Sequence, residues 1–217
     1  MELTHIGHSC LLVEAGGIRV LLDPGTFSHG FEELTGLDAV LITHAHHDHV
    51  DVERLPLLLE ANDGARLVAE PEVAASLRDA GIDAQPLHPG QSMAVGSLDV
   101  RAVGGEHALI HPDIPRIGNV GFVLAEDGGP VLFHPGDALE VIPDGVDVLA
   151  VPVSAPWQAA RDAVEFVRAV RPRVWLPIHD VLLSEPGRAL YLNLVNMLAP
   201  EGVALRDLAG AGATALP

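Results

Sequence analysis

The run His44-Ala45-His46-His47-Asp48-His49 has the clearest chemical potential in the sequence, because it offers four candidate metal ligands within six residues. These are His44, His46, Asp48 and His49, whereas His47 points away from them if the turn alternates. The run follows the apolar stretch 39–43, which predicts a buried strand, and it precedes a predicted helix. Loops that leave such strands commonly carry functional side chains. Imidazole and carboxylate groups suit Zn²⁺, Fe or Mn²⁺ better than Ca²⁺ or Mg²⁺, so the run predicts a metal site.

Covalent catalysis has few candidates in this chain. All 12 basic residues are arginine, which excludes a lysine Schiff base and a P-loop lysine. Cys10 is the single cysteine, so neither an intramolecular disulfide nor a cysteine-rich zinc cluster can form. Ser9 and Cys10 begin a predicted strand, and nothing in the sequence marks either as an activated nucleophile. The 12 histidines instead favour chemistry at a metal.

Short apolar runs between Gly, Pro and Asp turns predict the elements that must position these groups. The predicted strands cover 9–14, 18–22, 39–43, 66–69, 98–103, 120–125, 130–133, 147–153 and 173–177. The predicted helices cover 51–60, 71–80, 157–170 and 186–198. Strands of this length in alternation with a few amphipathic helices indicate an α/β (α+β) protein.

A weak internal repeat relates the two halves of the chain. The segment 20–25 (VLLDPG) matches 131–136 (VLFHPG), and 36–42 (GLDAVLI) matches 145–151 (GVDVLAV). Chance similarity of Gly and Asp turns between apolar strands is the alternative explanation. A duplication predicts two β-rich halves packed sheet against sheet with helices outside. Loops from matching strands then meet at one edge, where both halves could contribute to one site.

The composition of the chain limits the classes of partner that it is expected to bind. A chain of 217 residues with 48% hydrophobic and 19% charged residues is typical of a single globular domain. Its net charge of −18 disfavours nucleic-acid binding, which needs a basic face. No apolar stretch approaches the length of a membrane span, and the start of the sequence lacks the basic region of a signal peptide. We therefore expect a cytoplasmic protein without a membrane partner; a homo-oligomer remains open.

The spacing His44-x-His46-x-Asp48-His49 resembles the signature of the metallo-β-lactamase superfamily. Further motif positions of that family follow in order, at Asp23 (VLLDPG), His107 (GGEHA), Asp137 (FHPGD) and His179 (PIHD). The segment THIGHS, together with LDP, is similar to the branch that includes L-ascorbate-6-phosphate lactonase-like proteins. The resemblance implies a four-layer αββα sandwich in a single domain, 1–217, with halves near 1–118 and 119–217.

The resemblance also implies a role for each motif residue. His44, His46 and His107 would hold one metal, Asp48, His49 and His179 a second, and Asp137 would bridge both. Asp23 would accept a hydrogen bond from a ligand histidine. Zn²⁺ is the expected ion at both positions, with Mn²⁺ or Fe as alternatives. A hydroxide between the metals would attack an ester, lactone or phosphodiester bond of a small molecule, so Asp48 and Asp137 count among the catalytic residues.

Residues outside the ligand set are expected around it. His8 is expected to contact either a ligand or the substrate, and His134 is expected to contact a ligand, although a plain structural role is the alternative for each. His111 is a candidate proton donor, and Arg116 in the same loop is a candidate for binding an anionic substrate group. Trp157 could form a wall of the pocket or belong to the core.

Two other function classes stay open beside a metal-dependent hydrolase. The chain could bind metal without turnover, as a sensor or scaffold. It could also be an iron-dependent oxidoreductase on the same fold. The full set of seven expected ligands favours the hydrolase.

Overall fold

The computed structural model describes residues 1–216 and contains two seven-stranded mixed sheets. The first sheet has the strand order β14-β1-β2-β3-β4-β5-β6 and the second β13-β12-β11-β10-β9-β8-β7. The strands of the first sheet are β1 (Glu2–Gly7), β2 (Cys10–Ala15), β3 (Ile18–Leu22), β4 (Ala39–Ile42), β5 (Arg66–Ala69), β6 (Gln85–Pro86) and β14 (Thr214–Ala215). Those of the second are β7 (Ser92–Val95), β8 (Leu98–Glu106), β9 (Gly118–Glu126), β10 (Val131–His134), β11 (Val148–Pro152), β12 (Val174–Ile178) and β13 (Ala204–Leu205).

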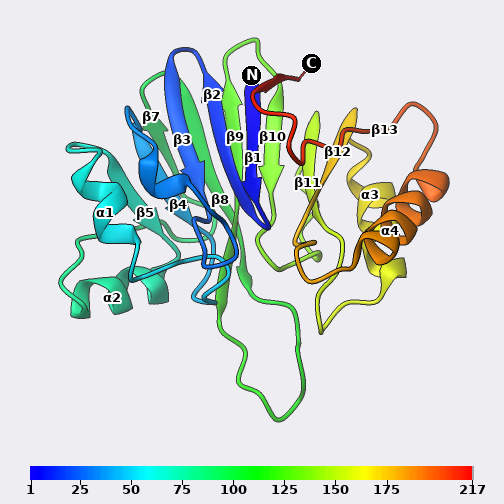
Figure 1. Cartoon of the computed structure of the whole chain (residues 1–217), viewed down its shortest axis with the longest axis horizontal. Coiled ribbons are helices and arrows are strands. Elements are labelled where there is room, and N and C mark those ends of the chain that lie inside the picture. The colour runs from blue at the N-terminus through cyan, green and yellow to red at the C-terminus, as the bar shows by residue number, and fades with distance from the viewer. Residues whose placement is uncertain (217) are drawn as a thin grey trace.

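Helices cover the outer face of each sheet, so that the molecule has four layers (Figure 1). The helices α1 (Leu55–Glu60) and α2 (Pro71–Asp79) lie on the first sheet, and α3 (Ala160–Val170) and α4 (Glu185–Leu198) lie on the second. A short 3₁₀ helix, η1 (Phe31–Glu33), follows β3. The predicted αββα sandwich of the metallo-β-lactamase type is thereby confirmed.

Alternation along the strands divides the apolar side chains among three cores. In β4, Ala39 and Leu41 face the core between the sheets, whereas Val40 and Ile42 pack against α1 and α2. In β11, Val148 points between the sheets and Leu149 toward α3 and α4. Because strands buried on both faces need apolar residues at every position, these two strands appear in the sequence as unbroken apolar runs.

The two sheets repeat one topology. In the first, β2 and β3 pair antiparallel, and β3, β4 and β5 then pair in parallel. In the second, β9 and β10 pair antiparallel, and β10, β11 and β12 pair in parallel. The matched segments 20–25 and 131–136 occupy β3 and β10 with the turns that follow them. The pattern is that of a duplication.

The sheets do not divide at the position expected for the halves. The second sheet begins at Ser92, so the hairpin of β7 and β8 belongs to it although it precedes residue 119. The strand β14 returns to the first sheet and pairs with β1. All nine predicted strands overlap strands of the structure, while five strands were not predicted: β1, β6, β7, β13 and β14.

Two helices begin later than predicted. The Asp51 carboxylate accepts hydrogen bonds from the backbone N–H groups of Glu53 and Arg54, which makes a turn of the residues before α1. Similarly, α3 begins at Ala160 and leaves Trp157 in the preceding loop. Of the helices within residues 1–216, none combines the length and apolar character that crossing a bilayer requires.

Candidate metal centre

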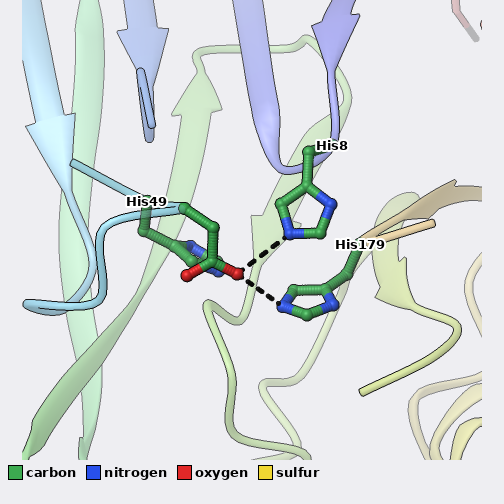
Figure 2. Close-up of side chains that lie close together, drawn as sticks. His8, His49 and His179 are labelled. Atoms are coloured by element: carbon green, nitrogen blue, oxygen red, sulfur yellow. Dashed lines mark hydrogen bonds and ion pairs between the residues drawn. The ribbon is translucent and has the colours of Figure 1, made fainter. Parts of the chain in front are cut away.

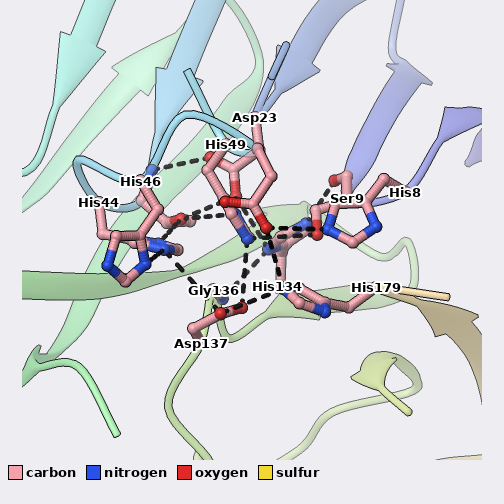
Figure 3. A network of polar contacts seen from close by, with 12 residues as sticks. His8, Ser9, Asp23, His44, His46, His49, His134, Gly136, Asp137 and His179 are labelled. Carbon is pink, nitrogen blue, oxygen red and sulfur yellow. Dashed lines mark hydrogen bonds and ion pairs between the residues drawn. The ribbon is translucent and has the colours of Figure 1, made fainter. Parts of the chain in front are cut away.

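The candidate ligands come from five loops that follow strands of both sheets (Figure 3). His8 lies in the turn between β1 and β2, and the segment 44–49 follows β4 of the first sheet. His107, Asp137 and His179 follow β8, β10 and β12 of the second sheet. The sandwich therefore gathers at one edge side chains that lie up to 171 positions apart in the sequence, from His8 to His179.

Two clusters of ligand-type atoms form at this edge, and within each cluster one such atom per residue lies within 4.8 Å of all the others. The His44 cluster consists of His44, His46, His107 and Asp137. The His49 cluster consists of His8, Asp48, His49 and His179. The structure thus brings together all seven residues expected to hold metal, and it adds His8, which was expected only to contact a ligand or the substrate.

Asp137 lies between the two clusters. Its Oδ2 atom is 3.5 Å from Nε2 of His107 and 3.2 Å from Nε2 of His179, while its Oδ1 atom is 3.2 Å from Nε2 of His49. The indole N–H of Trp157 also approaches Oδ2, at 3.3 Å. This carboxylate is the one expected to bridge two metals, and it lies within 3.5 Å of histidines from both clusters.

The His49 cluster is organised around Asp48, and Figure 2 shows how its three histidines lie relative to one another. Its Oδ2 atom lies 3.1 Å from Nε2 of His8 and 3.3 Å from Nε2 of His179. The rings of His8 and His179 lie with their centroids 4.1 Å apart. His8 therefore holds Asp48 from the side of the β1–β2 turn.

Unpartnered nitrogens show that these residues fit a cation. His107 and His179 each use Nδ1 on a backbone carbonyl, that of Ala108 and that of Ser154, both at 2.7 Å. Such bonds place the proton on Nδ1 and leave the Nε2 lone pair free. Both Nε2 atoms are buried without a hydrogen-bond partner. Since unsatisfied buried polar groups are costly and rare, a bound metal accounts for them.

Asp23 orients one histidine of each cluster. It accepts a hydrogen bond from Nδ1 of His49 at 2.7 Å and another from the Thr43 hydroxyl at 2.7 Å. Because that hydroxyl donates to Asp23, it accepts from Nδ1 of His44, 3.0 Å away. The Nε2 atoms of His44 and His49 are thereby left as the atoms that could bind a metal. The relay through Thr43 was not predicted, although Thr43 directly precedes the histidine-rich run.

Backbone strain is concentrated at the same edge. His8, Asp23 and His179 have φ values of 51°, 47° and 60°, in the left-handed region that most side chains avoid. The fourth residue of this kind within residues 1–216 other than glycine is Arg171, which ends α3. Strained positions cluster where function requires a particular geometry.

Two glycines allow the loops to approach one another. A Cβ at Gly25 would overlap the backbone of Asp48, so the turn after β3 lies directly against the histidine-rich loop. Gly136 has a φ of 61°, and a Cβ there would meet Thr43 and Asn119. The buried Asn119 side chain in turn accepts a hydrogen bond from the N–H of Asp137 at 2.9 Å. Backbone packing therefore determines where Asp137 lies.

The electrostatics of the site pair buried carboxylates with imidazoles. Burial disfavours the charged form of Asp137, yet His49, His107 and His179 lower the pKa of this carboxyl well below its usual range. Burial also opposes protonation of His179, but the neighbouring carboxylates of Asp137 and Asp48, 3.2 and 3.3 Å from its Nε2 atom, raise the pKa of the imidazole to about 9. The site thus favours carboxylate anions beside positive charge, which is the arrangement that a cation would complete.

The other expected residues have different outcomes. The ring of His134 contacts the Ser9 carbonyl through Nε2 at 2.9 Å and accepts from the N–H of Gly136, so it links the first sheet to the Asp137 loop. His111 belongs to neither cluster: its side chain is 60% exposed and accepts from the Asp113 N–H. The expected proton donor therefore does not reach the site.

Arg116 holds the backbone of His107 rather than facing the substrate cavity. Its Nε atom donates to the His107 carbonyl at 2.8 Å, and its other nitrogens lie 3.0 Å from Glu106 and 3.8 Å from Glu140. These contacts place Arg116 beside a ligand histidine and leave its charge matched by two carboxylates.

A cavity of about 250 Å³ opens onto the clusters. Trp157 forms part of its wall, which is one of the two positions considered for this residue from the sequence. Its ring packs edge-to-face on that of His107, with the ring centroids 5.8 Å apart. The remaining apolar wall comes from Phe27, Ile110, Pro156 and Leu182. These four residues were missed because isolated apolar residues in loops carry no pattern that points to a pocket.

Comparison with known proteins agrees with the geometry. A family model described as "Beta-lactamase superfamily domain" matches residues 2–179. Protein Rv0786c of Mycobacterium tuberculosis is 51% identical over 192 residues, which are 88% of this chain and 89% of that protein. The UPF0173 metal-dependent hydrolase of Opitutus terrae is 32% identical over 196 residues, 82% of this chain and 84% of that protein.

A solved structure shares the whole fold. Igni18, a metallo hydrolase from the hyperthermophilic archaeon Ignicoccus hospitalis, superposes with a TM-score of 0.72 at 21% identity, over 100% of this chain and 99% of that one. The fold, the clusters at its edge and these relatives converge. The chain belongs to the metallo-β-lactamase superfamily and, within it, to the UPF0173 metal-dependent hydrolases.

Proposed function

We propose that the protein is a dinuclear metal-dependent hydrolase that cleaves an ester, lactone or phosphodiester bond of a small molecule. The position of Asp137 supports this most strongly, because its carboxylate lies within 3.5 Å of histidines from both clusters. When bound, a pair of divalent cations lowers the pKa of water to about 7 and stabilises negative charge on oxygen. Zn²⁺ is our first choice for both positions.

The residues divide the work between the two clusters. His44, His46 and His107 would hold one cation, and Asp48, His49 and His179 the other, with Asp137 shared. His8 restrains Asp48, and Asp23 restrains His49 directly and His44 through Thr43. Asp48 and Asp137 both line the cavity, so their carboxylates can orient a water molecule toward the bond to be cleaved.

Hydrolysis of each candidate bond would follow the same steps. Water adds to the carbonyl carbon or phosphorus, the bond to the leaving oxygen breaks, and the proton of water passes to that oxygen. The similarity of THIGHS and LDP to lactonase-like proteins keeps a lactone among the candidates.

The test is metal-dependent turnover. Protein stripped with a chelator should hydrolyse neither p-nitrophenyl acetate nor bis(p-nitrophenyl) phosphate, and adding back Zn²⁺, Mn²⁺ or Fe²⁺ should restore hydrolysis of at least one. His46→Ala should remove that activity while keeping the fold by circular dichroism. Two bound metals without turnover of a broad panel would instead support a metal-binding protein, and iron-dependent oxygen consumption would support an oxidoreductase.

A further inference from the structure

The cavity of about 250 Å³ above the clusters has two kinds of wall. One side consists of cluster residues, among them His46, Asp48, Asp137 and His179. The other side is apolar and is formed by Phe27, Ile110, Pro156, Trp157 and Leu182. These five residues come from four separate loops, so the apolar wall is assembled by the fold rather than by one element.

The apolar wall has one neighbouring side chain that can carry a positive charge, the imidazole of His47, which also lines the cavity and packs edge-to-face on Phe27. Among residues 1–216 no arginine lines this cavity, and the sequence has no lysine. Arg116 lines only the adjoining cavity of about 70 Å³, where its three nitrogens already contact the His107 carbonyl, Glu106 and Glu140. A carboxylate or phosphate in the 250 Å³ cavity, away from the clusters and from His47, would therefore lose its hydration without gaining a permanently charged partner, which is costly.

We infer that the part of the substrate remote from the bond to be cleaved is uncharged and apolar, and that it lies between Phe27, Trp157 and Leu182. This inference rests on the proposed hydrolase function and replaces the anionic substrate expected from the sequence. Burial of each additional methylene against such a wall stabilises binding by about fourfold. The substrate is thus an ester, lactone or phosphodiester whose remote part is a short, neutral aliphatic or aromatic group.

The activity test compares two esters with one leaving group. The acyl groups of p-nitrophenyl hexanoate and mono-p-nitrophenyl adipate both have a six-carbon chain, but the second ends in a carboxylate. With metal restored and spontaneous hydrolysis subtracted, the hexanoate ester should have a kcat/KM at least about tenfold higher. Equal or faster cleavage of the adipate ester would overturn the inference and leave the hydrolase function intact.

A binding test is independent of turnover. N-phenylnaphthylamine and anilinonaphthalene sulfonate share a ring system and differ in the sulfonate, and both fluoresce in apolar surroundings. The neutral probe should bind the protein at least about tenfold tighter, with and without metal, and Trp157→Ala should weaken it. Tight binding of the neutral probe without hydrolysis of any ester, lactone or phosphodiester would contradict the proposed function alone, whereas preference for the sulfonate would contradict the inference alone.

A matched pair of variants locates the effect. Leu182 and Leu190 are 67% and 66% exposed, but only Leu182 lines the cavity. Leu182→Arg supplies the missing cation and should raise the adipate-to-hexanoate ratio of kcat/KM at least about fivefold. Leu190→Arg on α4 should leave that ratio unchanged. An equal response of both variants, or of neither, would show that the apolar wall does not select the substrate.

Discussion

The Asp23 carboxylate lies 2.7 Å from Nδ1 of His49, and both side chains are fully buried. The same carboxylate also receives the Thr43 hydroxyl, which in turn lies 3.0 Å from Nδ1 of His44. One carboxylate in the first sheet therefore determines the ring orientation of a histidine in each cluster. Removing it should affect both metal positions, although Asp23 belongs to neither.

Asp23→Asn should weaken metal binding about 10- to 100-fold, because the amide no longer stabilises the N–H tautomer of His49. Asparagine tolerates the left-handed φ of 47° at this position, which keeps the backbone intact. Titration with a competing chelator measures the affinity. Thr43→Val should weaken the His44 position more than the His49 position, while Thr43→Ser should behave like the parent; equal effects of Val and Ser would argue against the relay.

Asp137→Ala should lower the metal content of the purified protein at both positions, because its carboxylate contacts histidines of both clusters. His46→Ala should deplete only the His44 cluster and leave about one metal per chain. Elemental analysis by mass spectrometry reads the stoichiometry of both variants. Two metals per chain in Asp137→Ala would show that this carboxylate does not bridge.

Gly25→Ala should destabilise the fold by about 3 kcal/mol, because the added methyl overlaps the backbone of Asp48 and forces two loops apart. Metal affinity should fall with it, since the displaced loop carries four candidate ligands. Urea unfolding of the metal-free variant isolates the first effect. Gly129→Ala is the control: its nearest atoms are 3.4 Å away and its φ is not left-handed, so we expect a change below about 1 kcal/mol.

Asp207 gives the protein a dependence on pH that is separate from the metal centre. Arg188 of α4 donates two hydrogen bonds to this carboxylate, at 2.7 and 2.8 Å, and they hold its pKa below the ordinary value of 3.8. A carboxyl group whose pKa is lower in the folded state than in the unfolded state stabilises the fold at pH values above its unfolded-state pKa. This stabilisation is lost as the pH falls through the folded-state pKa. Asp207→Asn lacks this contribution at every pH.

The free energy of unfolding should therefore differ most between wild type and Asp207→Asn at neutral pH. The gap should stay constant down to about pH 4 and shrink below it, as the wild-type carboxyl takes up its proton. Urea titrations of both proteins across this range measure the gap. An unchanged gap at about pH 3 would exclude the Arg188 pair as its source.

The sequence predicts the layers of this fold well because both sheets contain strands buried on each face. The apolar runs 39–43 and 147–153 became β4 and β11, and the repeat around 20–25 and 131–136 became two equivalent turns. The strands β1 and β7 escaped prediction because polar residues interrupt the apolar pattern of β1 and exposed residues that of β7. The return of β14 to the first sheet is a long-range pairing that no local pattern encodes.

The residues of the candidate site show the same difference between local sequence patterns, which could be recognised, and long-range contacts, which could not. Residues that share a strand end and a motif, such as His44, His107 and His179, could be grouped before any coordinates. His8 could only be placed near them, because its approach to Asp48 depends on how the β1–β2 turn meets a loop 40 residues away. His111 shows the converse, since its position four residues after His107 suggested a nearness that an exposed loop does not provide.

The His44 cluster takes two histidines from a loop of the first sheet and two ligands from loops of the second. An ion bound there would cross-link loops of the two sheets. Its binding adds to the folding free energy about 2.7 kcal/mol when the free ion exceeds its dissociation constant a hundredfold. The free energy of unfolding should thus rise with the concentration of free metal, and we expect proteases to digest the metal-free protein faster than the loaded protein.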